Sequence, residues 1–266
     1  MLRDLFTYIT QPNKRACRKV VSFGGKAMAR VDLAAVLDGN KAACMDPELG
    51  LPSAAPCLVY SLGINDEWSF DWDMEAFGCN VFAFDPSMNA TAGDQNGTIS
   101  FARYGVGGED GRHPRHPDWQ MRTLDTLADE MGHAQSTIHY LKMDVEGSEW
   151  EVLQQQVARG RDSLLFRSVE QLGAELHFYP RSDTAPAEQH VRFHRQVYAS
   201  FLGLQEMGFY PFSYEANPSQ ESDVVIPGLD RKITPAMEVV WLKTRCVDNA
   251  GGDSKRDRSP GLRFVW

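Results

Sequence analysis

The sequence predicts an α/β protein with a mostly parallel sheet and helices on both of its faces. From residue 57 onwards, short apolar runs alternate with longer segments of helical pattern, which is typical of parallel strands joined by crossover helices. Later in the chain, apolar runs at residues 209–215 and 237–243 follow one another without a complete helix between them. These two runs predict an antiparallel hairpin at one edge of the sheet.

Each strand is expected where a short apolar run lies between turn residues. We predict strands at residues 57–62, 81–84, 99–104, 138–145 and 164–169, the last one extended by residues 171–178. We predict helices at residues 66–77, 124–131, 148–159 and 190–207, where apolar residues are spread over longer segments. Gly78 and Gly208 are expected to end helices. Ser148 is expected to cap a helix that has acidic residues in its first turn.

The composition divides the chain into three segments. Residues 1–55 have mixed character, with an early helical pattern and several turn signals, and are expected to form an N-terminal extension packed on the main domain. Residues 56–246 contain the alternating pattern and are expected to form that domain. Residues 247–266 are rich in glycine, serine and charged residues, which predicts a mobile C-terminal tail.

The net charge of −9 excludes broad binding to nucleic acid or to an anionic membrane, because both need a basic face. A local basic pocket is still compatible with it. The first residues contain no long apolar core, and no window approaches the roughly 20 apolar residues of a membrane span. A cytoplasmic protein is therefore the default expectation. A secretory lumen stays open if an anchor precedes this chain.

The five cysteines do not form a C-x-x-C pair, so a zinc ribbon is not predicted. Cys57 and Cys79 adjoin strand-like runs and are expected to be small core residues. Cys17 and Cys44 lie in the loop-rich N-terminal segment and could pair in an oxidising compartment. Because the number is odd, at least one thiol is expected to be unpaired.

Two acidic residues follow the predicted strand at residues 138–145. Residues at positions i and i+2 of a strand project to the same side, so Asp144 and Glu146 are expected to converge. Open α/β sheets bind ligands at the carboxyl ends of their strands. Because unpaired buried acids are costly, this pair predicts a ligand, a cation or hydrogen-bond donors nearby.

The first strand–turn–helix unit contains Gly63, and Asp85 ends the next strand about 20 residues later. This spacing is typical of units in which an acid accepts hydrogen bonds from both ribose hydroxyl groups. Gly63 stands alone, and Asp66 and Glu67 would repel a pyrophosphate at the start of the helix. The unit therefore favours a nucleoside without phosphates. S-adenosylmethionine is the common one, and its positive sulfonium tolerates an acidic site.

The chain resembles the FkbM-type S-adenosylmethionine-dependent methyltransferases, and among them the eukaryotic methyltransferase-like proteins. The resemblance is carried by residues 59–71, 78–87 and 141–150, and more weakly by residues 175–178. It implies a Rossmann-like class I methyltransferase fold with a seven-stranded sheet and a reversed last hairpin. It also implies S-adenosyl-L-methionine as the cofactor, bound at Gly63, at its neighbours Ser61 and Asn65, and at Asp85.

Ser61 departs from the pattern, because many methyltransferases have an acid there that holds the methionine amino group. The contact with the methionine amino group would then come from Asp144 or Asn65. The reaction implied is an in-line methyl transfer to an oxygen or nitrogen, and the expected acceptor is a hydroxyl group of a small molecule or glycan. A base or orienting residue is then needed. The candidates are Asp144, Glu146, Glu170 and His177, and no metal ion is predicted.

Structural roles are open for the same residues. Asp144 could be a structural acid that caps the helix starting at Ser148, Glu146 could bind backbone amides in the turn before that helix, and Asp85 could form a simple Asp-Pro turn. His177 could be a buried histidine with satisfied hydrogen bonds, and Glu170 could pair with Arg167 or Arg181.

Other residues and functions have competing readings too. His113 and His116 are expected in a solvated loop rather than a zinc site, and Trp68, Phe70 and Trp72 in a helix core. The alternative function is a non-catalytic relative that binds a nucleoside or a partner. The single glycine counts against a nucleotide-dependent oxidoreductase.

Overall fold

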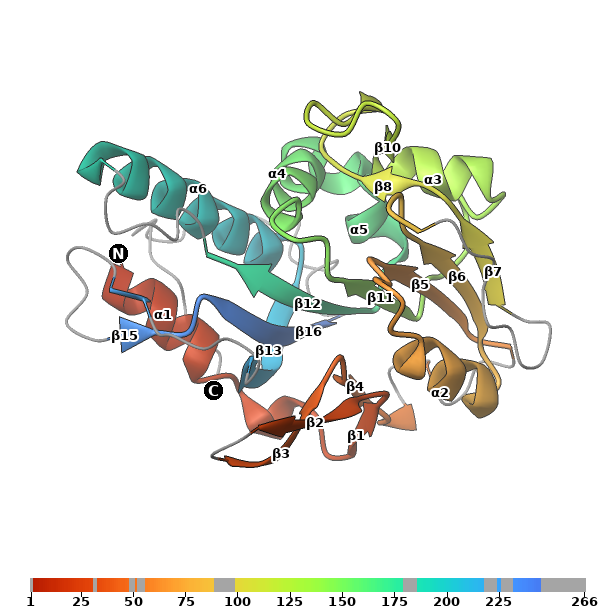
Figure 1. The fold of residues 1–266 in the computed structure, drawn as a ribbon, viewed down its shortest axis with the longest axis horizontal. Helices are drawn as coiled ribbons and strands as arrows, with labels where there is room; N and C mark the ends of the chain where they lie inside the picture. The colour runs from red at the N-terminus through yellow and green to blue at the C-terminus, as the bar shows by residue number, and fades with distance from the viewer. Residues whose placement is uncertain are drawn as a thin grey trace, which may run out of the picture.

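The computed structural model describes residues 2–30, 33–47, 51, 56–88, 99–178, 186–217, 224–225 and 232–244. A seven-stranded sheet crosses the molecule in the order β13-β16-β12-β11-β5-β6-β7 (Figure 1). Its strands are β5 (Leu58–Leu62), β6 (Asn80–Phe84), β7 (Ile99–Ala102), β11 (Tyr140–Met143), β12 (Gln171–His177), β13 (Phe209–Ala216) and β16 (Ala236–Lys243). Only β16 runs antiparallel to its neighbours. The predicted fold class and the reversed hairpin are confirmed.

Alternation along the strands divides the core into two layers. Tyr60 and Leu62 of β5 belong to one buried cluster, and Val59, which directly precedes Tyr60, belongs to the other. The first layer contains the helices α1 (Leu2–Thr10), α3 (Leu124–Glu130), α4 (Glu149–Arg159), α5 (Leu164–Ser168) and α6 (Ala187–Glu206). Helix α2 (Ser69–Phe77) and the N-terminal strands cover the opposite face (Figure 1).

The N-terminal segment folds into antiparallel pairs. Strand β1 (Val20–Phe23) pairs with β4 (Lys41–Cys44), and β2 (Lys26–Arg30) pairs with β3 (Leu33–Asp38). The Tyr140 hydroxyl donates to the Ala42 carbonyl, and the Gln171 side chain bonds the backbone N–H and C=O of Cys44. These bonds fix β4 against the central sheet. The domain boundaries at residues 55 and 246 and the tail at 247–266 fall outside the described residues and stay predictions.

Short elements complete the described fold. They are the 3-10 helices η1 (Lys14–Ala16) and η3 (Gly160–Asp162), a small sheet of β8 (Gly105–Val106), β10 (Gln120–Arg122) and β9 (Gly111–Arg112), and the pair β14 (Val224–Val225) with β15 (Lys232–Ile233). None of the helices in the described ranges is long and apolar enough to cross a membrane.

The structure corrects four local predictions. Residues 164–168 form helix α5 instead of a strand, because Ser163 caps it by accepting a hydrogen bond from the Phe166 N–H. A short apolar run cannot distinguish the two states. Helix α2 begins at Ser69 rather than residue 66, since Asn65 and Asp66 have positive φ values of 44° and 62° and form a turn.

The loop expected around His113 and His116 includes a short strand, because Gly111–Arg112 pair with β10. Ser148 lies at the N-cap of α4 as predicted, but its side chain makes no capping hydrogen bond.

Both cysteine pairs of the described segment form disulfides. Cys17 is joined to Cys44, which was the pairing left open. Cys57 and Cys79 are buried in the core, as predicted, and are also joined by a disulfide that the sequence argument did not anticipate. Each of these two precedes a strand by one position, and β5 and β6 pair in parallel with Leu58 opposite Asn80, which brings the two cysteines together. Cys246 lies outside the described residues.

Candidate functional site

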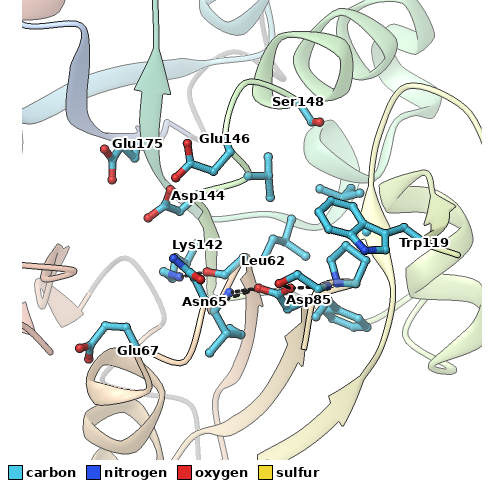
Figure 2. A pocket seen from close by; sticks show the side chains of 18 of the residues that line it. Leu62, Asn65, Glu67, Asp85, Trp119, Lys142, Asp144, Glu146, Ser148 and Glu175 are labelled. Atoms are coloured by element: carbon cyan, nitrogen blue, oxygen red, sulfur yellow. Dashed lines mark hydrogen bonds between the residues drawn. The ribbon is translucent and has the colours of Figure 1, made fainter. Parts of the chain in front are cut away.

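A cavity of about 630 Å³ opens at the carboxyl ends of β5, β6, β11 and β12. Gly63, Asp85 and Asp144 all line it, so the structure brings together the three positions on which the sequence argument rested. Figure 2 shows Asp85 and Trp119 on one side of this space, and Asp144, Glu146 and Glu175 on the other. The two sides differ in chemistry.

Gly63 fixes the shape of the cavity floor. Its φ is +77°, and a Cβ built on it would overlap the backbone carbonyl oxygen of Asp144. Its N–H donates to the Phe84 carbonyl, and its own carbonyl accepts from the buried Lys142 ammonium. Only glycine allows β5 and β11 to approach so closely here.

Asp85 organises the turn after β5. One carboxylate oxygen accepts from the N–H groups of Ile64 and Asn65 at 2.8 and 2.9 Å, and the other accepts from the N–H and hydroxyl of Ser87 at 2.8 and 2.6 Å. Burial alone would raise the pKa of Asp85, but these four hydrogen bonds outweigh it and hold the pKa below its usual range. The Asp-Pro turn role is therefore real, and a ribose hydroxyl would have to share or replace the Ser87 donor.

Of the other two predicted cofactor residues, one lines the cavity and the other does not. Asn65 lines the cavity from the turn after β5. Ser61 does not line it: its hydroxyl is buried in the sheet with no hydrogen-bond partner among the described residues. The direct cofactor contact predicted for Ser61 is therefore not carried forward, because the strand turns this side chain away from the cavity.

Asp144 stands in a crowded acidic wall. The buried Lys41 ammonium lies 2.6 Å from Glu238 and 3.9 Å from Asp144. Burial would raise the pKa of Asp144, but Lys41 and Lys142 outweigh it and lower the pKa. Glu175 is affected in the opposite direction, because burial and then the charges of Asp144 and Glu238 raise its pKa to about 9. At neutral pH Asp144 is thus a carboxylate and Glu175 holds a proton.

His177 is buried among carboxylates rather than isolated on its strand. Its Nδ1 lies 2.9 Å from Glu149, and its Nε2 lies 3.6 Å from Glu146 and 3.5 Å from Glu175. Burial would lower the pKa of His177, but the hydrogen bond and charge of Glu149, followed by the charge of Glu175, raise it to about 9. In this state His177 is positively charged at neutral pH, which removes it as a general base.

Glu170 is not part of the cavity. It precedes the amino end of β12, where its backbone bonds Ile138 and Lys243, while the cavity lies at the carboxyl end of that strand. The predicted catalytic role of Glu170 is therefore not carried forward. Of its suggested partners, Arg167 lies 3.6 Å from Asp125, and Arg181 lies outside the described residues.

Sequence reasoning missed three residues of the cavity wall and of the acidic group beside it. Lys41 and Glu238 come from segments 197 residues apart, so no local pattern relates them. Trp119 lies in a polar loop and stacks on His116 at 4.2 Å, next to His113. All three loop residues line the cavity. The available signal was the single tryptophan that follows the histidine and proline residues of this loop. Trp68 and Phe70 are buried, which confirms their prediction as core.

Two curated proteins are similar to this chain. The chain is 29% identical over 157 residues to "Probable methyltransferase-like protein 24" of Rattus norvegicus, covering 56% of this chain and 41% of the relative. It is 28% identical over 144 residues to the Homo sapiens protein of that name, covering 51% and 37%. The chain therefore spans about two fifths of the length of these curated relatives.

Among solved structures, a fibrillarin pre-rRNA processing protein of Methanococcus jannaschii is similar at 10% identity and a TM-score of 0.38, covering 82% of each chain. A SAM-dependent methyltransferase from Agrobacterium tumefaciens is similar at 13% identity and a TM-score of 0.37, covering 79% of this chain and 69% of that one. A family model described as "Methyltransferase domain" matches residues 21–228. The chain belongs to this methyltransferase domain family.

Proposed function

We propose that this protein transfers a methyl group from S-adenosylmethionine to a hydroxyl group of a small molecule or glycan. The observation that carries the proposal is the single cavity shared by Gly63, Asp85 and Asp144 at the carboxyl ends of parallel strands. Within the family, residues 78–87 and 141–150 favour the FkbM-type branch.

The residues present fit this cofactor. Gly63 lines the cavity where the Asp144 backbone packs against it, and the Asp85 turn offers a ribose site next to Ser87. The indole of Trp119 provides a flat surface for an adenine base on the same side (Figure 2). The acidic wall on the other side suits the positive ammonium and sulfonium groups. When bound, the cofactor supplies an activated methyl group with a good leaving group.

The protein's own contribution is positioning and proton handling. Asp144 keeps a charged carboxylate at the cavity wall, so it can accept a hydrogen bond from an acceptor hydroxyl or from the ammonium group of the cofactor. Glu175 and His177 hold their protons at neutral pH and can donate rather than accept. Asp144 is therefore the best candidate for orienting the acceptor.

A second cavity of about 960 Å³ offers a place for the acceptor. It shares His113, Arg115, Glu146 and Ser148 with the first cavity. Its other lining residues include Asp110, Arg112 and Glu151, so both donors and acceptors surround it. Such a polar groove favours a hydroxyl-rich acceptor, and the net charge of −9 disfavours nucleic acid.

We also infer an oxidising compartment such as the secretory lumen. The two disulfides of the N-terminal half would be reduced in the cytosol, where thiols are kept free. They favour the lumenal alternative over the cytoplasmic default.

The test is calorimetry with S-adenosylmethionine, followed by transfer of a labelled methyl group to a panel of sugars and small hydroxyl compounds. Asp85→Ala should weaken cofactor binding by roughly 100-fold, because it removes the partner of two turn amides. Asp129→Ala, an exposed acid on α3, is the matched control. Binding without transfer would favour the non-catalytic relative. Absence of binding by the wild-type protein would contradict both functions.

A further inference from the structure

Three metal-binding side chains converge on one wall of the cavity. Asp144, Glu146 and His177 each direct one ligand atom to a common region, and these atoms all lie within 4.8 Å of one another. Figure 2 shows the carboxylates of Asp144 and Glu146 side by side there. Donor atoms around an ion at about 2.1 Å are separated by roughly 3 to 4.3 Å. The 3.6 Å between His177 Nε2 and Glu146 Oε2 falls within that range.

The imidazole is oriented as metal ligands usually are. Its Nδ1 is held at 2.9 Å by Glu149, a fully buried acid whose position is fixed by the Val145 N–H. Histidines that bind metals commonly donate their second nitrogen to such a carboxylate, which leaves the other nitrogen directed at the ion. The second Glu149 oxygen is buried with no hydrogen-bond partner among the described residues.

The wall around the three donors has more acidic than basic groups. Glu175 lies 3.5 Å from His177, and Asp144, Glu175 and Glu238 form a second group of converging oxygens. Lys41 pairs with one oxygen of Glu238, and the other oxygen is buried beside Glu175. A divalent ion bound there would take the place of the Nε2 proton of His177 and would balance the carboxylates of Asp144 and Glu146.

We propose that Asp144, Glu146 and His177 bind a divalent cation whose remaining coordination positions face the cavity. Two carboxylates and one imidazole suit Mn²⁺ and its neighbours better than Mg²⁺, which prefers oxygen ligands alone. Three protein donors leave positions for an acceptor's oxygen atoms, and the ion would lower the pKa of a bound hydroxyl. This last role rests on the proposed methyl transfer, while the ion site itself does not.

The test is binding of Mn²⁺ alone to the full chain after dialysis against a chelator, measured by calorimetry and electron paramagnetic resonance. We expect one ion per chain and a nitrogen hyperfine signal from the imidazole. Glu146→Gln should weaken binding at least tenfold, and because its side chain is 73% exposed the fold should be unaffected. His177→Gln should abolish the nitrogen signal. Glu67→Gln, which removes the same charge from the opposite part of the cavity, should change neither.

Three outcomes would overturn the proposed ion site. Absence of binding by the wild-type protein at millimolar Mn²⁺, or equal loss in Glu67→Gln and Glu146→Gln, would overturn the site in favour of a diffuse acidic surface. An unchanged nitrogen signal in His177→Gln would also overturn it. Cofactor binding is measured separately in chelator, so failure of the ion site leaves the proposed methyl transfer intact, and the reverse also holds.

Discussion

The carboxyl groups of Asp85 and Glu175, on the two sides of the cavity, have pKa values shifted in opposite directions. Asp85 is surrounded by four donors from its own chain, and its pKa is lowered. Glu175 meets other acids, and its pKa is raised to about 9. The first carboxylate is satisfied by backbone and hydroxyl donors and shapes a turn, whereas the acids of the opposite wall repel one another and are only partly offset by Lys41, Lys142 and His177. The comparison teaches that the fold satisfies the donor-rich side by itself, whereas the acid-rich side is where we propose that a positively charged ligand binds.

The largest expected effect comes from the glycine between the two sides. Gly63→Ala should destabilise the protein by more than about 4 kcal/mol, because the new Cβ overlaps a backbone oxygen of β11 and cannot be relieved by a rotamer change. Gly132→Ala is the matched control, with the same φ of +77° and no atom within 4 Å of its Cβ. It should cost only about 1 kcal/mol. Equal losses in denaturant unfolding would show that conformation, not contact, dominates.

The disulfide beneath the donor-rich side should contribute next. Replacing Cys57 and Cys79 together by serine should lower the free energy of unfolding by about 3 kcal/mol, since the bond closes a loop between positions 22 residues apart. Thermal unfolding with and without reductant measures it. Mass spectrometry without reduction should find Cys57 and Cys79 in one linked peptide. Free thiols at both positions would contradict the assignment.

On the acid-rich side, removing a charge should stabilise the protein. The folded pKa of Glu175 is raised from 4.5 to about 9, so the folded state binds its proton more tightly and stability falls as pH rises through that window. Glu175→Gln keeps the oxygen that accepts from Asn217 and should raise stability at pH 8 by on the order of 1–2 kcal/mol. The gain should vanish near pH 4. A stability difference between Glu175→Gln and the wild-type protein that does not change with pH would contradict the raised pKa of Glu175.

The smallest effect is expected at the aromatic residue on the donor-rich side. Trp119→Ala should weaken S-adenosylmethionine binding about tenfold, because stacking of a base on an aromatic ring is worth roughly 1–3 kcal/mol. Calorimetry measures it, and Trp72→Ala provides a control on helix α2 that does not line the cavity. Unchanged affinity would place the adenine elsewhere.

The sequence was informative wherever a feature is local. Strand periodicity predicted the reversed hairpin at 209–215 and 237–243, and strand-end positions predicted that Gly63, Asp85 and Asp144 would meet. It failed where the partner is distant or the run is short. Residues 164–168 are too few to distinguish the period of a helix from that of a strand. No sequence pattern near Lys41 indicates that it pairs with Glu238. The link between Cys57 and Cys79 was accessible, because both precede strands predicted to be neighbours.

The position of Lys41 shows that the structural unit extends upstream of the alternating strand and helix pattern. The βα pattern starts near residue 57, yet the ammonium that neutralises Glu238 arrives on β4, from the antiparallel strands that precede it. A shortened chain cut at the pattern boundary would retain every strand of the central sheet while exposing that acid to its like-charged neighbours. The N-terminal segment thus supplies, through Lys41, the counterion of Glu238 in the central sheet.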